Sequence, residues 1–149
     1  LISNKFEDTF RVLRGIMSKT NSYQPGIMIF REGEKGNCAY IVNSGAVELS
    51  KMGPNNKKIV VEIIRDGIFA VLPLVDNQPR QYTAIALEET QCTVITRKMF
   101  EERLSATDPA VRSVVRFLTR SLRDATNQLT KGEVLDFDST EVKWTYMNE

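Results

Sequence analysis

The pattern of hydrophobic and polar positions predicts helices at both ends of the chain and strands between them. Residues 4–19 place apolar side chains at three- and four-residue steps, as on one face of an amphipathic helix. These side chains are Phe6, Phe10, Leu13 and Met17. From about 22 to 96, short apolar runs alternate with glycine, asparagine and proline, which predicts short strands joined by tight turns. Because no run there has the length and period of a helix, a sandwich, barrel or roll is favoured over β–α–β units.

Two helices are predicted after the strands. The first covers about 97–104, and the second covers about 109–129, where Asp108 can cap the free N–H groups and Pro109 suits the first helical position. Apolar residues recur along the second helix at helical spacing. They are Val111, Val114, Val115, Leu118 and Leu122. We expect this face to pack on the strands or to meet a second copy of the helix.

Another face of the same helix carries arginines. They are Arg112, Arg116, Arg120 and Arg123. A solvated face is the ordinary interpretation of such a stripe, and a docking surface for an acidic partner or for the chain's own tail is the alternative. The tail at 131–149 is acidic and aromatic without a clear period, so we assign the folded domain to 1–130. No DNA-binding element is predicted, because the tail is too short to form a winged helix.

Composition narrows the classes of function. The 149 residues and the net charge of +1 fit one domain with no general attraction to nucleic acid or anionic membranes. The chain has no histidine, and Cys38 and Cys92 lack the close spacing of metal ligands, so we expect no metal site and no catalytic centre. Both cysteines lie in strand-like runs, which indicates reduced thiols in a cytoplasmic protein. The longest uncharged apolar run, 68–75, is too short to cross a bilayer, and a start at Leu1 is consistent with a fragment of a larger protein.

The most specific pattern is the spacing of glycines and apolar residues at 23–48. Gly26, Gly33, Gly36 and Gly45 fall at breaks between strands, where tight turns often need the positive φ that glycine adopts most readily. In register with them stand Pro25, Phe30, Glu32, Tyr40, Ile41, Val42 and Val47. This layout resembles the first half of a cyclic nucleotide-binding domain, and the resemblance covers about 4–125. It implies a mainly β fold, a double-stranded β-helix or jelly-roll-like β-roll over about 22–96, with an N-terminal helix and C-terminal helices over about 97–129.

The resemblance also implies a role for Arg80. Members of the family hold the cyclic phosphate in a cassette between the sixth and seventh strands, where an arginine and backbone N–H groups grip it. The chemistry is sound, because a guanidinium offers paired donors to phosphate oxygens and a helix N-terminus offers more. The chain matches this cassette at Phe69, Pro79, Arg80 and Thr83. An ion pair with Asp76, or a place in solvent, is the alternative for the arginine.

Other cassette positions depart from the family. Ala70 stands in place of a glycine and loses freedom of φ, and Val71 stands in place of the glutamate that holds the ribose hydroxyl. Pro73 falls inside the short helix, where it suits only the first turn. Tyr82 stands in place of a small alanine, so its ring either turns outward or partly fills the pocket. The candidate ligand-binding residues are Arg80, Thr83, Ala70, Val71, Tyr82 and Gln81.

Two functions are consistent with these residues. In the first, cAMP or cGMP binds in the β-roll of a regulatory sensor, moves the C-terminal helix and signals to another domain or subunit. In the second, the fold is degenerate, binds neither nucleotide, and acts as a protein-interaction or dimerisation module, with a homodimer through 109–129. We expect no enzymatic activity, no cofactor other than such a ligand, and no membrane segment in this chain.

Overall fold

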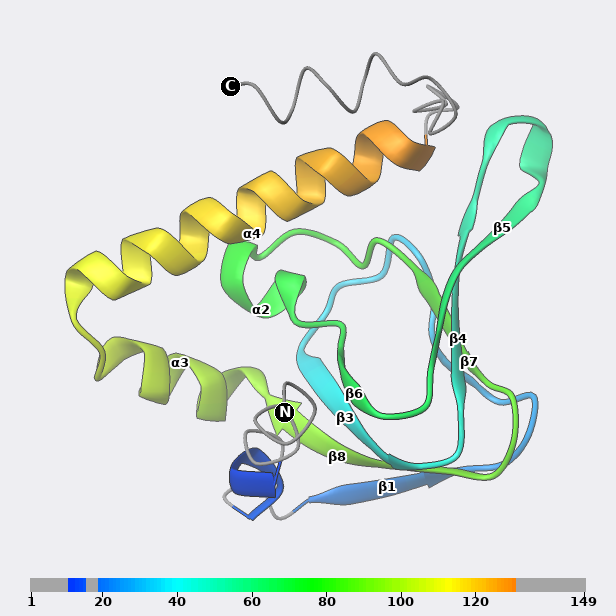
Figure 1. Ribbon diagram of the computed structural model, residues 1–149, viewed down its shortest axis with the longest axis horizontal. Helices are drawn as coiled ribbons and strands as arrows, with labels where there is room; N and C mark the ends of the chain where they lie inside the picture. The colour runs from blue at the N-terminus through cyan, green and yellow to red at the C-terminus, as the bar shows by residue number, and fades with distance from the viewer. Residues whose placement is uncertain (1–10, 16–18, 131–149) are drawn as a thin grey trace, which may run out of the picture.

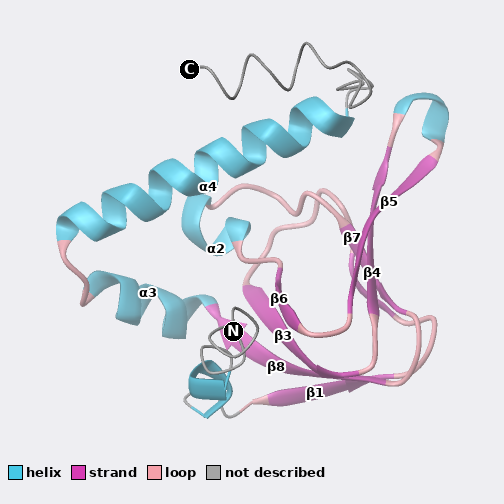
Figure 2. Ribbon diagram, viewed as in Figure 1, coloured by secondary structure: helices cyan, strands magenta, loops and turns pink. Residues whose placement is uncertain are grey.

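The computed structural model, which describes residues 11–15 and 19–130, is a β-roll with helices along one side (Figure 1). The strands are β1 (Thr20–Tyr23), β2 (Met28–Phe30), β3 (Cys38–Ser44), β4 (Val47–Met52), β5 (Lys58–Ile64), β6 (Gly67–Phe69), β7 (Thr83–Ala86) and β8 (Thr90–Thr96). The helices are α2 (Leu72–Asp76), α3 (Arg97–Ser105) and α4 (Pro109–Thr130), with a 3₁₀ turn at Pro54–Asn56 and a helical stretch at 11–15. Figure 2 shows α2, α3 and α4 together on one side of the strands. The predicted mainly β fold with flanking helices is confirmed.

The strands form two antiparallel four-stranded sheets, with the orders β1-β8-β3-β6 and β2-β7-β4-β5. Most spatial neighbours are distant in the sequence, as the pairing of Tyr40 in β3 with Val94 in β8 illustrates. The β4–β5 hairpin contains a bulge between Leu49 and Ser50, and β5 is the edge strand of its sheet. This hairpin extends past the roll toward the C-terminal half of α4 (Figure 1).

Aromatic rings from both sheets form the centre of the main core. Tyr40 stacks on Phe69 with ring centroids 5.2 Å apart and on Phe30 with centroids 6.0 Å apart. These separations are those of favourable aromatic pairs. All three side chains are buried. Because Phe30 belongs to β2, and Tyr40 and Phe69 belong to β3 and β6, the rings join the two sheets.

A second apolar cluster attaches the helices to the outside of the first sheet. Its buried members are Ala39, Ile41, Leu74 and Ile95, and Leu13, Ile68, Val71, Met99 and Phe100 pack against them. The cluster therefore fixes α2 and α3 against β3 and β8. The described part of the predicted N-terminal helix contributes Leu13, while Phe6, Phe10 and Met17 lie outside the described residues.

The long C-terminal helix begins where the sequence predicts. The Oδ1 atom of Asp108 accepts a hydrogen bond from the N–H of Ala110 at 2.8 Å, and Pro109 is the first helical residue. α4 then crosses over α2 on the open side of the roll (Figure 1). The predicted tail at 131–149 lies outside the described residues. The consequence of this arrangement is that α2 lies between the roll and α4.

Candidate functional site

The segment between β6 and β7 brings most of the candidate residues together. It begins at Ala70, whose φ of +65° lies in the left-handed region that a Cβ disfavours. α2 follows, with Pro73 in its first turn, where the missing N–H is not needed. The helix ends at Asn77, also left-handed, and a loop returns to β7 through Arg80. The expectation that Pro73 suits only a first turn is confirmed.

Arg80 is buried beneath this segment, with 6% of its surface exposed. Its Nη1 donates to the carbonyl of Ala70 at 3.3 Å, and its Cζ lies 4.2 Å from the centre of the Phe30 ring. Its backbone is also held: the N–H donates to Glu34 O at 2.8 Å, and the carbonyl accepts from Gly33 N–H at 2.9 Å. The arginine is therefore fixed at both its main chain and its side chain.

Gly36 leaves the space that the guanidinium occupies. A Cβ on Gly36 would lie 2.7 Å from Cβ of Pro73, which is closer than real Cβ contacts, and 3.0 Å from Cζ of Arg80, which is tighter than most of them. The positive φ predicted for the four glycines of this region is found at Gly26, Gly33 and Gly45. For Gly36 that prediction is wrong, because no positive φ is found there and close approach is what requires a glycine.

The positive charge of Arg80 has no carboxylate partner within the described ranges. Asp76, the predicted alternative partner, pairs with Arg123 instead. The Nε of Arg80 is buried and has no hydrogen-bond acceptor among the described residues. Burial lowers the pKa of Arg80, and the nearby Tyr40 is the largest of the influences that oppose this shift. A buried cation with an unused donor is unfavourable until an anion supplies an acceptor and a charge.

A cavity of about 300 Å³ borders Arg80. This volume is at the lower end of the range for small-molecule sites. Five of the six candidate residues line it: Ala70, Val71, Arg80, Gln81 and Tyr82. Thr83 does not line the cavity. Its Oγ1 accepts a hydrogen bond from the N–H of Glu32 at 3.0 Å, which joins β7 to the segment after β2.

Two of the departures from the family pattern have a visible structural consequence. The half-buried ring of Tyr82 packs against the main core and lines the cavity, so it turns inward and narrows the space. Val71 lines the same cavity and also packs against the second apolar cluster. A hydrocarbon at position 71 therefore contributes to the attachment of α2 and offers no acceptor for a ligand hydroxyl.

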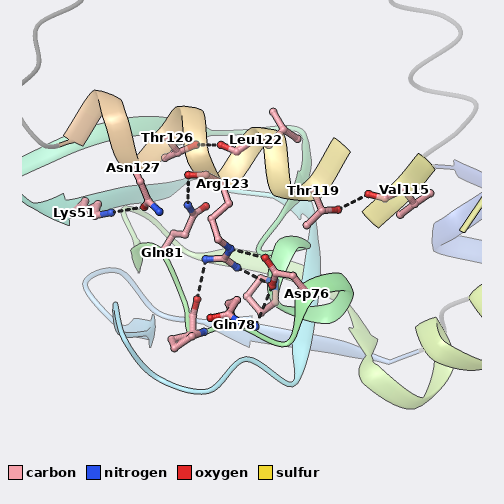
Figure 3. Close-up of polar contacts among 12 residues, drawn as sticks. Lys51, Asp76, Gln78, Gln81, Val115, Thr119, Leu122, Arg123, Thr126 and Asn127 are labelled. Carbon is pink, nitrogen blue, oxygen red and sulfur yellow. Dashed lines mark hydrogen bonds and ion pairs between the residues drawn. The ribbon is translucent and has the colours of Figure 1, made fainter. Parts of the chain in front are cut away.

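α4 covers one side of the cavity and is tied to α2. Leu122 and Thr126 of α4 line the cavity. Figure 3 shows Arg123 reaching from the same helix to Asp76, with Nε 2.5 Å from Oδ2 and Nη2 2.9 Å from Oδ1. The Nε2 of Gln81 donates to the carbonyl of Arg123 at 3.5 Å. Side chains and backbone of the cassette are thus connected directly to the C-terminal helix.

The described residues include no metal-binding cluster and no disulfide. No group of histidine, cysteine, aspartate and glutamate residues among them could hold a metal ion. Cys38 and Cys92 are free thiols, and burial raises the pKa of Cys92 to about 11. None of the described helices combines the length and the apolar composition that a membrane span needs.

The β-roll, the short helix after its sixth strand and the long terminal helix define a class of ligand-binding regulatory domains. A family model described as the cyclic nucleotide-binding domain matches residues 20–107. The chain therefore belongs to the cyclic nucleotide-binding domain family, as the spacing at 23–48 indicated.

Two curated relatives are transcriptional regulators. The HTH-type transcriptional regulator Cmr of Mycobacterium tuberculosis is 32% identical over 94 residues, which are 62% of this chain and 38% of that protein. The CRP-like cAMP-activated global transcriptional regulator of the same organism is 27% identical over 120 residues, which are 76% of this chain and 54% of that protein. The chain thus spans between about a third and about half of the length of these relatives.

Solved structures agree with the fold and the family. The EAL enzyme Bd1971 in its cAMP-bound form superposes with a TM-score of 0.66 and 32% identity, over 74% of this chain and 30% of that one. Its cGMP-bound form gives the same values. The catabolite activator protein of Thermus thermophilus, at 24% identity and a TM-score of 0.64 over 80% of this chain and 56% of that one, shares the fold.

Two features of the site escaped the sequence analysis. Glu62 lines the cavity from β5, and no motif marked it, because its position depends on strand register. The interpretation of the arginine stripe as a solvated face is wrong for Arg123, since its side chain is only 14% exposed and pairs with Asp76. In the sequence, the only sign of the Asp76–Arg123 pair is that the two residues carry opposite charges.

Proposed function

We propose that this chain is a regulatory sensor domain that binds a cyclic nucleotide in the cavity, with the cyclic phosphate on Arg80. One observation carries the proposal: a buried guanidinium with an unpartnered Nε borders a cavity and lacks a carboxylate among the described residues. A phosphate oxygen would supply both the acceptor and the charge. The cAMP-bound and cGMP-bound forms of the similar Bd1971 structure support this class of ligand.

The sugar is held less strongly in this proposal than the phosphate. Val71 cannot accept a hydrogen bond from a ribose hydroxyl, and a buried hydroxyl without a partner costs about 1–3 kcal/mol. Tyr82 narrows the cavity from its inner side. We therefore expect a weaker site than one with an acidic residue at position 71.

In this proposal, a ligand that fills the cavity moves α4. The ligand would contact Ala70 and Val71 before α2, Arg80 after it, and Leu122 on α4. Because α2 and α4 are joined by the Asp76–Arg123 ion pair, a displacement of α2 by the ligand would move α4 as well. A neighbouring domain or subunit attached to α4 would receive the change.

Isothermal titration with cAMP and with cGMP tests the proposal. We expect saturable binding by the wild-type chain, and a loss of at least about tenfold in affinity for Arg80→Met, which keeps side-chain length but removes the charge-assisted donors. Arg120→Met, at an exposed arginine on α4, is the matched control and should bind normally. If neither nucleotide binds at millimolar concentration, or if Arg80→Met binds normally, the proposal is contradicted.

An exposed apolar stripe on α4 favours a second candidate function, that of a dimerisation module. Its members are Val111, Val114, Phe117, Leu118 and Leu122, each 52–68% exposed. We propose that this stripe meets the same stripe of a second copy, since solvent exposure of so many neighbouring apolar side chains is unfavourable. Sedimentation analysis should show a dimer that Leu118→Glu disrupts and Arg116→Glu does not. A chain that stays monomeric at all accessible concentrations would rule this function out.

A further inference from the structure

Arg97, the first residue of α3, reaches back toward the cassette. Its Nη2 donates hydrogen bonds to the carbonyl of Gly36 at 2.6 Å and to the carbonyl of Pro73 at 3.1 Å. Its backbone N–H donates to the carbonyl of Asn37 at 2.9 Å. Gly36 and Asn37 lie between β2 and β3, whereas Pro73 belongs to α2. One residue therefore joins three segments that are far apart in the sequence.

Both of the carbonyls that Arg97 binds through Nη2 belong to residues beside Arg80. A Cβ on Gly36 would meet Pro73 at 2.7 Å and the guanidinium of Arg80 at 3.0 Å, so the three residues lie close together. Pro73 and Arg80 also line the same cavity. Because Arg97 holds Gly36 and Pro73 with a single nitrogen, it keeps the segment between β2 and β3 close to α2. The space that Arg80 occupies depends on this spacing.

The hydrogen bonds to the two carbonyls, and not an ion pair, are the main contacts of the Arg97 guanidinium. Its pair with Glu101, one turn along α3, has a separation of 3.5 Å, and Glu101 is 58% exposed. Exposed pairs of this kind contribute little to stability. The bonds to Gly36 and Pro73 are shorter and partly buried, and hydrogen bonds from a charged donor are among the stronger ones in proteins.

Arg97 also contributes a positive charge near Arg80. Burial is the main cause of the lowered pKa of Arg80, and the charge of Arg97 acts in the same direction. Two cations near each other repel, and an anion bound at Arg80 would offset the repulsion. Arg97 itself does not line the cavity, so any effect on a bound ligand would pass through Arg80 and the residues around it.

We propose that Arg97 is a positioning residue that holds Arg80 in place for a cyclic phosphate by fastening α2 to the segment between β2 and β3. This inference rests on the proposed function, although the placement of Arg80 can be measured without a ligand. Lysine at position 97 would keep the charge but lose the planar, rigid array of donors. Arg97→Lys therefore separates the charge from the fastening, and Arg97→Met removes both.

Titration of the full chain with cyclic AMP and cyclic GMP, well below its unfolding temperature, measures the effect on binding. We expect the affinity for whichever nucleotide binds more tightly to fall about tenfold or more in Arg97→Met and about fivefold or more in Arg97→Lys. Glu101→Gln removes the ion pair and keeps the carbonyl contacts, so it should bind within about twofold of wild type. Arg103→Met, at an exposed arginine of the same helix, is the matched control and should bind normally.

The Nε–H resonance of Arg80 in ¹H–¹⁵N NMR measures the placement of this residue in the free chain. Its assignment comes from its loss in Arg80→Met. We expect the resonance to shift or broaden in Arg97→Lys and to stay in place in Glu101→Gln. A residue that only attached α3 to the fold would lower the stability of the chain in urea and leave this resonance unchanged.

The outcomes separate this inference from the proposed function. If the wild-type chain binds neither nucleotide, the proposed function is overturned, and the Arg80 resonance of the free chain alone decides whether Arg97 positions it. If nucleotide binds and Arg97→Lys matches wild type in affinity, the fastening is not needed and the inference is overturned. A loss of affinity with an unchanged Arg80 resonance also overturns it. A loss of affinity together with a displaced resonance, in a folded Arg97→Lys chain, supports it.

Discussion

The guanidinium of Arg123 holds the carboxylate of Asp76 at two points, with Nε 2.5 Å from Oδ2 and Nη2 2.9 Å from Oδ1. Because Asp76 is engaged in this way, it does not neutralise Arg80, although both residues belong to the segment between β6 and β7. The same ion pair attaches α4 to α2. One interaction thus leaves the cavity with an arginine that lacks a described counter-charge and connects the cassette to the terminal helix.

Removal of one charge of this pair should loosen α4. For Asp76→Asn we expect the free energy of unfolding to fall by about 1–2 kcal/mol, because the two side chains are mostly but not fully buried. Backbone amides of α4 should exchange faster with deuterium. Asp124→Asn, on the exposed side of α4, is the control. If Asp76→Asn and Arg123→Met destabilise additively in a double-mutant cycle, the pair contributes no coupling and this prediction is wrong.

A methyl group at position 36 should displace Arg80. In Gly36→Ala the new Cβ would lie 2.7 Å from Cβ of Pro73 and 3.0 Å from Cζ of Arg80, so α2 or the guanidinium must shift. We expect a loss of about 1–3 kcal/mol in urea unfolding and a matching loss of nucleotide affinity. Gly15→Ala, with no atom within 4 Å of its Cβ, should unfold at the same urea concentration or higher. Equal stability of Gly36→Ala and wild type would contradict the close packing of Pro73 and Arg80 against Gly36.

Glycine at position 70 should relieve backbone strain. Ala70 has a φ of +65°, which costs about 1–2 kcal/mol for a residue with a Cβ. Part of the relief is offset, because glycine also gains freedom in the unfolded chain. We expect Ala70→Gly to raise stability by about 0.5–1 kcal/mol. Ala106→Gly, at a φ of −80°, should lower or preserve it. Destabilisation of Ala70→Gly in thermal unfolding would contradict the assigned backbone conformation.

Alkaline pH should destabilise the chain through Tyr40. Burial raises the pKa of Tyr40 from 10.0 to about 12. Between these values the unfolded chain releases a proton that the folded chain retains, so the free energy of unfolding falls as pH rises, by about 1.4 kcal/mol per pH unit. This stability is fully present below pH 10. In Tyr40→Phe the slope over this window should be smaller, whereas an unchanged slope would remove Tyr40 as its cause.

The sequence was sufficient for the local features of this fold and insufficient for its long-range contacts. The left-handed turns at Gly26 and Gly45 and the cap by Asp108 depend on single residues, so they could be predicted. The place of Glu62 at the edge of the cavity depends on the register of the β4–β5 hairpin, and the bulge after Leu49 that sets this register has no signature in the chain. Contacts between segments far apart, such as Asp76 with Arg123, depend on how α4 crosses α2.

The most direct test of the central claim is the Nε–H resonance of Arg80 in ¹H–¹⁵N NMR, assigned by its loss in Arg80→Met. Nε is buried without an acceptor among the described residues, so a cyclic phosphate that binds there should provide one. We predict a downfield shift and slower solvent exchange of this resonance as cyclic GMP or cyclic AMP is added. A resonance that stays in place at saturating nucleotide would contradict the assignment of Arg80 as the phosphate-binding residue.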